Sequence, residues 1–399
     1  MCLLAALGCA PAGSAPVPAP ARPPAIVLVS IDGFRPDYLA RGVTPVLDSL
    51  AHAGVRAEWL EPSFPTKTFP NHYTLVTGLR PDRHGIIANN ITDSVLGRLT
   101  MAARDAVRDA RWWGGEPVWV AASRAGLRAA PYFWPGSEAP IGGGWASRWM
   151  GFDGGFPVAA LVDSVIAALD GPAGDAVAFA TLYTAAVDHA GHEFGPDSPL
   201  VDDSLRAADA MLGRLTRRLH ERGLAESVNL IVVSDHGMAP VGPERVIVLD
   251  DFVSLDDITV HDWGPAVMIA PRPGRAEAVY RALRGAHPAL DVHWKQDVPA
   301  RLAFGSHPRV PAIVAIAADG WTVTSRARAS RVEPGGNHGF DNALPSMRAL
   351  FVASGPAFRR GAVVAPFSNI HVYELMAHVL GIQAAANQGS LDSVRAVLR

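Results

Sequence analysis

Residues 25–33 read AIVLVSIDG, an unbroken apolar run followed at once by an acidic residue and a glycine. The run is rich in β-branched residues and lacks the polar alternation of a strand that has one face in water. It therefore predicts a parallel strand covered on both faces, with Asp32 at its carboxyl end. In open α/β sheets, ligands bind at that end of the strands.

Similar apolar runs recur along the chain, and patterns of helical spacing lie between them. Strands are expected at residues 177–182, 230–233, 267–270, 313–317 and 349–353, and helices at 45–53, 158–169 and 200–219. This alternation predicts an α/β fold with a mostly parallel, doubly wound sheet. The glycine- and proline-rich stretches 134–157 and 236–309 are expected to leave the sheet and to form a small lobe that shapes the substrate slot.

The composition of the 399 residues narrows the class of protein. Hydrophobic residues make up 49% and charged residues 18%, which is typical of a folded globular chain. There are 35 Lys and Arg against 38 Asp and Glu, with no basic block, so the chain lacks the electrostatic footprint of a protein that binds duplex nucleic acid. No apolar run after residue 24 approaches the length of about 20 residues that a transmembrane helix needs.

The first 24 residues are expected to be an export signal and a linker. Residues 1–10, MCLLAALGCA, are followed by a stretch rich in Pro, Ala and Gly, which resembles a secretory signal without its basic start. The sequence around Cys9 also resembles an imperfect bacterial lipoprotein box, in which Cys9 would carry a lipid anchor. We therefore expect a periplasmic or secreted protein, with a membrane-anchored lipoprotein as the alternative, and one folded domain over residues 25–399.

Acidic residues and histidines follow several of the expected strands, or lie among glycines that let the backbone approach closely: Asp32, Asp188, His192, Asp235, His236 and His338. The only cysteines lie within the first ten residues, so a metal in the body would take nitrogen and oxygen ligands. Alone, an Asp-Gly pair is usually a turn and Asp-His-Gly a polar strand end. Together the six ligands suffice for two zinc-like ions, a common device for displacement at phosphorus.

The segment 65–73, PTKTFPNHY, supplies a nucleophile. Thr68 precedes Phe69-Pro70 and an apolar run, which places it at a helix N-terminus, where backbone N–H groups favour anions. Coordinated to zinc, which lowers the pKa of bound water to about 7, a hydroxyl can attack as an alkoxide. The local alternative is that Thr68 is simply the N-cap of the helix.

These residues resemble the nucleotide pyrophosphatase/phosphodiesterases of the alkaline phosphatase superfamily, and the chain looks closest to their bacterial members. The motifs that carry the resemblance are residues 32–33, 65–89, 188–192, 234–238 and 337–340, and the likeness extends from about residue 25 to 380. It implies an alkaline-phosphatase-like α/β three-layer sandwich with a mostly parallel central sheet, inserted loops and a small lobe. It also implies two Zn²⁺ ions and cleavage of nucleotide phosphodiesters and pyrophosphates to nucleoside 5′-monophosphates.

The resemblance further implies a role for each site residue. One zinc would be held by Asp188, His192 and His338, the other by Asp32, Asp235 and His236, and Thr68 would touch the second ion and form a phosphothreonine. Asn89, with the backbone amide after the nucleophile, would donate hydrogen bonds to a phosphoryl oxygen. A hydrophobic slot for the nucleobase would be formed by Phe69, Trp134, Phe152 and Tyr183, each of which could equally be a core residue.

Some features narrow or leave open the choice of substrate. Gly114 stands where vertebrate relatives that favour nucleotides carry a lysine, which argues against a preference for nucleoside triphosphates. Residues 184–187 offer no cation for a second phosphate charge, which favours diesters, and Thr68 replaces the Cys or Ser of sulfatases. His189 is expected to be an exposed neighbour. The alternatives are a phospholipase C-like or glycerophosphodiester phosphodiesterase at the same site, or an inactive binding protein; we expect a monomer.

Overall fold

The computed structural model describes residues 24–172 and 174–399, so the predicted export signal, Cys2 and Cys9 lie outside the described residues. Seven strands form the central sheet: β1 (Ala25–Ile31), β2 (Val55–Ala57), β6 (Ala129–Ala130), β7 (Phe179–Thr184), β8 (Val228–Val233), β17 (Phe351–Ser354) and β18 (Ala362–Val364). Their order is β18-β2-β17-β8-β1-β7-β6. The strands β8, β1, β7 and β6 are parallel, and β17 runs antiparallel to both of its neighbours. The predicted mostly parallel sheet is confirmed.

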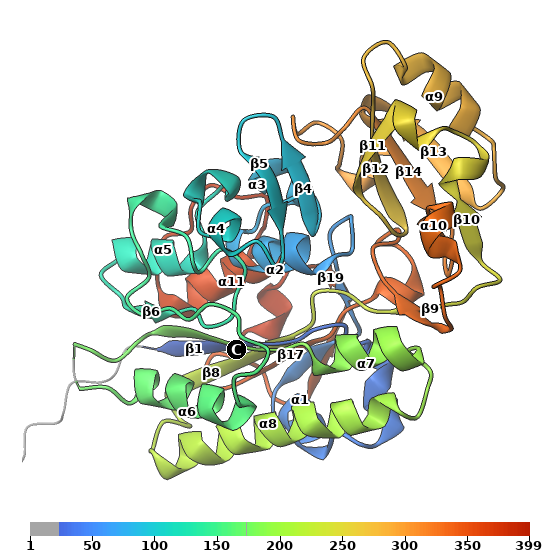
Figure 1. The fold of residues 1–399 in the computed structure, drawn as a ribbon. Coiled ribbons are helices and arrows are strands. Elements are labelled where there is room, and N and C mark those ends of the chain that lie inside the picture. Colours follow the sequence, from blue (N-terminus) through green and yellow to red (C-terminus); the bar gives the residue numbers. More distant parts are fainter. Residues whose placement is uncertain (1–23, 173) are drawn as a thin grey trace, which may run out of the picture.

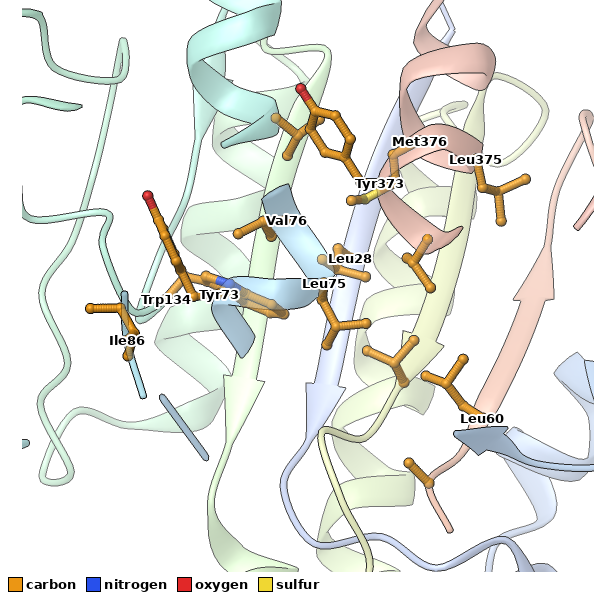
Figure 2. Close-up of a cluster of buried hydrophobic side chains, with 14 of the residues drawn as sticks. Leu28, Leu60, Tyr73, Leu75, Val76, Ile86, Trp134, Tyr373, Leu375 and Met376 are labelled. Carbon is orange, nitrogen blue, oxygen red and sulfur yellow. The ribbon is translucent and has the colours of Figure 1, made fainter. Parts of the chain in front are cut away.

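Helices cover both faces of this sheet and make three layers (Figure 1). One face carries α1 (Pro45–Ala53), α6 (Val158–Leu169) and α8 (Val201–Glu221), and the other carries α2 (Thr68–Thr77), α5 (Val118–Arg124) and α11 (His371–Leu380). Along β1, Val27 and Val29 pack with the first set of helices, whereas Ile26 and Leu28 pack with the second. Figure 2 shows Leu28 beside Leu75 of α2 and near α11. Because neither face of β1 meets water, its sequence does not alternate.

The predicted helices match the observed ones closely. The bounds of α1 and α6 are those predicted, and α8 begins one residue later than predicted and ends at Glu221. The strand expected at 177–182 is shifted, since β7 begins at Phe179 and ends at Thr184. This shift brings the end of β7 closer to the acidic residue that follows it in the chain.

A separate lobe lies at the upper right of Figure 1. It contains the strand predicted at 267–270, within the stretch expected to leave the sheet, and also the strand predicted at 313–317, which lies beyond that stretch. This lobe contains an antiparallel sheet of order β11-β12-β14-β13, formed by β11 (Ile258–Asp262), β12 (Ala266–Pro271), β13 (Leu290–Trp294) and β14 (Ile313–Ala317). The placement of residues 313–317 in the parallel sheet was therefore wrong. Met268 and Val314 pack into the core of the main body, while Val267 and Ala315 pack in the lobe core with α9 (Ala276–Leu283).

Because the inner strands β12 and β14 of this small sheet are buried on both faces, they show the same apolar pattern as parallel strands. The lobe also continues past residue 309, through β14 to β15 (Thr322–Thr324), which pairs with β10 (Val246–Val248). The other expected excursion, 134–157, does not join the lobe. It returns to the edge of the central sheet, where Phe133 N donates to Met150 O over 2.8 Å.

The remaining short elements connect the sheet, the lobe and the loops. They are β3 (Leu60–Glu61) paired with β19 (Phe367–Ser368), the hairpin β4 (Asn90–Asp93) and β5 (Gly97–Thr100), β9 (Ala239–Val241) paired with β16 (Gly335–Asn337), and the helices α3 (Pro81–His84), α4 (Arg104–Val107), α7 (Ala186–Phe194) and α10 (Arg326–Ala329). Within residues 24–172 and 174–399, none of the helices combines the length and apolar character that crossing a bilayer requires.

Candidate metal and nucleophile site

Four segments from distant parts of the chain bring the predicted ligands to one edge of the central sheet. Asp32 follows β1, Asp235 and His236 follow β8, Asp188 and His192 lie on α7 after β7, and His338 follows β16. The ring centroids of His236 and His338 are 3.6 Å apart, with the rings stacked. The glycines before His338 allow the predicted close approach, since a Cβ added at Gly336 would lie only 2.4 Å from Gly191 O.

The six side chains form one continuous cluster. Ligand atoms of Asp188, His192 and His338 all lie within 4.8 Å of one another, which is the trio predicted for one ion. Asp32 lies within the same distance of Asp188 and His236. His236 Nε2 lies 2.9 Å from Asp235 Oδ2 and 3.5 Å from Asp32 Oδ1, so it faces both carboxylates of the other predicted trio.

Backbone carbonyls fix the orientation of all three predicted histidine ligands. A carbonyl oxygen can only accept, so in each ring Nδ1 carries the hydrogen and Nε2 is left with its lone pair. The contacts are His192 Nδ1 to Gly336 O at 2.8 Å, His236 Nδ1 to Gly237 O at 2.8 Å and His338 Nδ1 to Thr66 O at 2.9 Å. Metal-binding histidines typically have this arrangement.

His72 is a neighbour of the site that sequence reasoning missed. Its Nδ1 lies 3.4 Å from Asp235 Oδ2, and it groups with Asp32 and Asp235. However, His72 Nδ1 donates to Thr68 O at 2.9 Å and Nε2 contacts Ser30 Oγ at 2.8 Å, so both ring nitrogens are engaged. We therefore regard His72 as a support for Asp235 rather than a ligand. Its position one helical turn after Thr68 could have predicted that it lies near the site.

Each carboxylate of the cluster has one oxygen that lacks the hydrogen-bond partner a buried charge needs. Among the described residues, Asp32 Oδ1, Asp188 Oδ1 and Asp235 Oδ2 are buried and accept no hydrogen bond. Burial raises the pKa of Asp32 well above its ordinary value, and the negative charges of Asp235 and Asp188 raise it further. Burial likewise raises the pKa of Asp188. Divalent cations would neutralise these oxygens, so the residues present fit a metal site.

Asp235 and His338 are shifted in directions that suit ligands. Burial acts to raise the pKa of Asp235, but the neighbouring His236 and His72 outweigh it and hold this pKa well below its ordinary value. Burial lowers the pKa of His338 well below its usual range, helped by His236 and His192, so the imidazole stays neutral. Metal binding requires deprotonated carboxylates and neutral imidazoles.

Thr68 is the first residue of α2, and the N-cap is Lys67, so the alternative that Thr68 is only an N-cap is wrong. Its Oγ1 lies 3.5 Å from His236 Nε2, beside the cluster. Asn89 lies next to it, because Phe69 N donates to Asn89 Oδ1 at 2.9 Å. The two groups that the resemblance assigns to a phosphoryl oxygen therefore contact each other directly.

A cavity of about 560 Å³ opens beside Thr68, and Asp32 and Asp188 also line it. Its aromatic walls include all four residues predicted for the nucleobase slot, Phe69, Trp134, Phe152 and Tyr183. Trp134 is almost fully buried, and its Nε1 donates to His72 O at 3.0 Å. His189, as expected, is an exposed neighbour of the cluster.

Several residues that line this cavity could not be assigned to it from the sequence. They are Met101, Ala102, Arg104, Val107, Trp113, Phe133, Glu138 and Ala185. Arg104 donates a hydrogen bond to the nearly buried Glu138, so the polar part of the wall depends on a pair from distant segments. Only the fold brings these residues together.

Comparison with known sequences relates the chain to phosphodiesterases. Residues 26–341 match the family described as Type I phosphodiesterase / nucleotide pyrophosphatase. An uncharacterized pyrophosphatase/phosphodiesterase of Schizosaccharomyces pombe is 37% identical over 382 residues, which are 92% of this chain and 79% of the yeast protein. A human bis(5′-adenosyl)-triphosphatase is 35% identical over 94% of this chain and 82% of its own length. The chain spans about half, 48%, of a venom phosphodiesterase of Crotalus durissus collilineatus to which it is 35% identical.

Solved structures of similar fold come from the same kind of protein as the similar sequences. Murine ectonucleotide pyrophosphatase/phosphodiesterase 5, in an inactive threonine-to-alanine variant in complex with AMP, superposes with a TM-score of 0.90 at 35% identity. The match covers 94% of this chain and all of the murine chain. The human counterpart superposes with the same score.

Proposed function

Since the chain belongs to the Type I phosphodiesterase / nucleotide pyrophosphatase family, we propose that it hydrolyses nucleotide phosphodiesters and pyrophosphates at Thr68, releasing nucleoside 5′-monophosphates. The predicted enzyme class, a phosphodiesterase or pyrophosphatase of this family, is confirmed by that membership. The relatives described above come from yeast, a snake and mammals, so the bacterial origin stays a prediction.

The observation that carries the proposal is the position of Thr68. Its hydroxyl lies 3.5 Å from His236 Nε2, at the edge of the acidic and histidine cluster, and it also lines the aromatic cavity. A nucleophile in this position can meet a phosphorus atom whose nucleoside occupies the cavity. The AMP bound by the murine relative supports a nucleotide as the occupant.

Two Zn²⁺ ions are the proposed cofactors. Asp188, His192 and His338 would hold one ion, and Asp32, Asp235 and His236 would hold the other, with Thr68 beside it. When bound, such ions supply positive charge next to the phosphoryl group and lower the pKa of a coordinated hydroxyl. The lone pairs of the three Nε2 atoms and the unpaired carboxylate oxygens support this assignment.

The proposed reaction has two displacements. Thr68 Oγ1 gives up its proton to solvent and attacks phosphorus in line. The bond from Oγ1 to phosphorus forms and the opposite bond breaks, so the leaving oxygen departs with the electron pair and takes a proton from solvent. Asn89 keeps the Phe69 amide at the nucleophile and offers its Nδ2 hydrogens to a non-bridging oxygen, a role in which one lost donor costs about 3–4 kcal/mol. Water then attacks the phosphothreonine, and Thr68 regains its hydroxyl. Two inversions give net retention at phosphorus.

Turnover of a chromogenic nucleotide diester tests the proposal. We expect chelation to abolish turnover, zinc to restore it, and Thr68→Ala to lower it by a factor on the order of 1000 or more while bound metal is retained. Thr68→Ser, which keeps a hydroxyl, is the matched control and should retain partial activity. Full turnover in Thr68→Ala would contradict the covalent step. Faster turnover of a choline-headgroup diester than of the nucleotide diester would favour the phospholipase C-like alternative instead.

A further inference from the structure

A buried ion pair joins the small lobe to the residue before the nucleophile. Lys67 Nζ donates a hydrogen bond to Asp262 Oδ2 at the end of β11, and a second one to Trp263 O at 3.3 Å. The side chains of Lys67 and Asp262 are only 6% and 5% exposed. The reaction proposed above uses neither of these side chains. Two buried charges need a reason to be there, because burial away from water is costly unless they are well paired.

The other oxygen of the same carboxylate holds a second segment of the site. Asn90 Nδ2 donates to Asp262 Oδ1 at 2.9 Å. Asp262 therefore binds the neighbour of Thr68 with one oxygen and the neighbour of Asn89 with the other. These two segments meet where Phe69 N donates to Asn89 Oδ1. One carboxylate from the lobe thus holds both sides of the contact that would face a phosphoryl group.

The backbone of β11 is irregular at the point that presents this carboxylate. In the ladder with β12, Val260 pairs with Ile269 and Asp262 pairs with Met268, so His261 is an extra residue, a β-bulge. Bulges bend a strand, re-aim its side chains, and are common beside active sites. A regular strand would give Asp262 a different direction.

Lys67 also packs against the predicted ligand segment. A Cβ added at Gly339 would lie 2.8 Å from Lys67 Cε, so the lysine stem lies directly over the residue after His338. His338 Nδ1 in turn donates to Thr66 O at 2.9 Å. Residues 66–68 are therefore held from two sides, by the lobe through Asp262 and by the segment that carries His338.

We infer that Asp262 is a positioning residue: it holds the start of α2 and Asn89 in register with each other and keeps the Lys67 ammonium on the lobe side of Thr68. The inference rests on the proposed function for its kinetic effect. Its structural effect, a more mobile start of α2 when the carboxylate is lost, does not depend on any activity.

Removing one partner alone would leave an unpaired buried charge and could unfold the protein. The test is therefore the double variant Lys67→Met/Asp262→Asn, which removes both charges and nearly preserves side-chain size. We expect kcat for a nucleotide diester to fall by about tenfold or more, because misplacing a reacting group by about 1 Å can slow a reaction by a larger factor than this. KM should change by less than about twofold, because the change affects the position of the reacting groups more than substrate binding. Hydrogen exchange of the peptide that contains the Phe69 amide should become faster, and bound metal should be retained.

Asp93→Asn is the matched control. Asp93 is another carboxylate that ties the body to the lobe, through Arg309 Nε at 3.0 Å, and it lies on the same strand as Asn90. It should keep wild-type kcat and wild-type exchange at Phe69.

Wild-type kcat and exchange in the double variant would overturn the inference, as would an equal loss of kcat in Asp93→Asn. Failure of the proposed function would look different, because the wild-type protein itself would then show no metal-dependent turnover. In that case the exchange measurement decides alone: faster exchange confined to the Phe69 peptide supports the inference, and unchanged exchange overturns it.

Discussion

Tyr183 donates its hydroxyl hydrogen to Asp32 Oδ2 over 2.6 Å, while the residue also lines the cavity beside Thr68. One side chain thus joins the wall predicted for the nucleobase to a predicted metal ligand. Burial raises the pKa of Tyr183 well above its ordinary value, and the negative charge of Asp32 raises it further, so the phenol remains a donor. The two roles of Tyr183 can be separated by mutation.

Tyr183→Phe should weaken metal binding more than nucleotide binding. The variant loses the hydrogen bond to Asp32 but keeps an aromatic face, and loss of such an outer partner typically lowers metal affinity by about 10–100-fold. Zinc affinity measured by competition with a chelator should fall accordingly, while KM for a nucleotide diester at saturating zinc stays near the wild-type value. Tyr183→Leu should change both, and an unaltered zinc affinity in Tyr183→Phe would contradict the prediction.

The metal-stripped protein should lose stability as pH rises above neutrality. Burial and like charges raise the folded-state pKa of Asp32, and burial raises that of Asp188, so ionising them in the folded protein is unfavourable. His236, whose pKa is raised because Asp235 outweighs the effect of burial, acts in the same direction. For a raised folded-state pKa, stability is full below the unfolded value and is lost as pH rises through the folded one.

The depressed pKa values of Asp235 and His338 do not oppose this trend above neutrality. Their contributions are complete above their unfolded values of about 3.9 and 6.5 and are lost only at lower pH. Thermal unfolding of stripped and zinc-loaded protein at several pH values tests the prediction. The loaded protein should show a flatter profile, and Asp32→Asn should flatten that of the stripped protein. Equal slopes for stripped and loaded protein would argue against a metal at these carboxylates.

Phe152→Ala should raise KM for nucleotide diesters. Phe152 is 48% exposed on the cavity wall, 5.7 Å between ring centroids from Tyr183, and one base-stacking contact is worth about 1–3 kcal/mol. We therefore expect a KM increase of roughly 5–100-fold with little change for an alkyl diester that has no base. Trp149→Ala removes another partly exposed aromatic of the same loop and should leave KM unchanged. Equal effects on substrates with and without a base would mean that Phe152 does not stack on the base.

Leu28→Ala should destabilise the whole fold. Leu28 is fully buried between the central sheet and the helices α2 and α11 (Figure 2), and truncation of such a leucine costs about 2–5 kcal/mol. Urea unfolding followed by fluorescence measures the loss. Val363→Ala, at a position that is 55% exposed, should change stability by less than about 0.5 kcal/mol. A similar loss in both variants would contradict this account of the core.

Local sequence patterns sufficed to predict the elements whose apolar pattern or local motif reflects their position in the fold. The run 25–31 is apolar because both faces of β1 are covered, and the motif around Thr68 places that residue at the start of α2. The strand at 313–317 was misassigned because β14 is also buried on both faces, and the pattern does not distinguish a parallel from an antiparallel partner.

The contacts that hold the site in shape could not be predicted in the same way. His72 touches Asp235, and Asp262 touches Lys67, only because segments far apart in the chain meet in the fold. In the sequence alone, Asp262 is a single acidic residue in a short strand and His72 is a histidine on a helix, and neither pattern indicates a role in the site. Their partners become visible only when the register of β11 and the face of α2 are known.

The stacked rings of His236 and His338 have a consequence for biosynthesis. The lobe sequence lies between these two histidines in the chain. During translation, His236 therefore cannot stack on His338 until the lobe and β16 have emerged from the ribosome. A complete set of ligands therefore exists only late in translation. Nascent chains that end before residue 338 should fail to bind the two proposed metal ions, so metal binding should follow folding rather than guide its first steps.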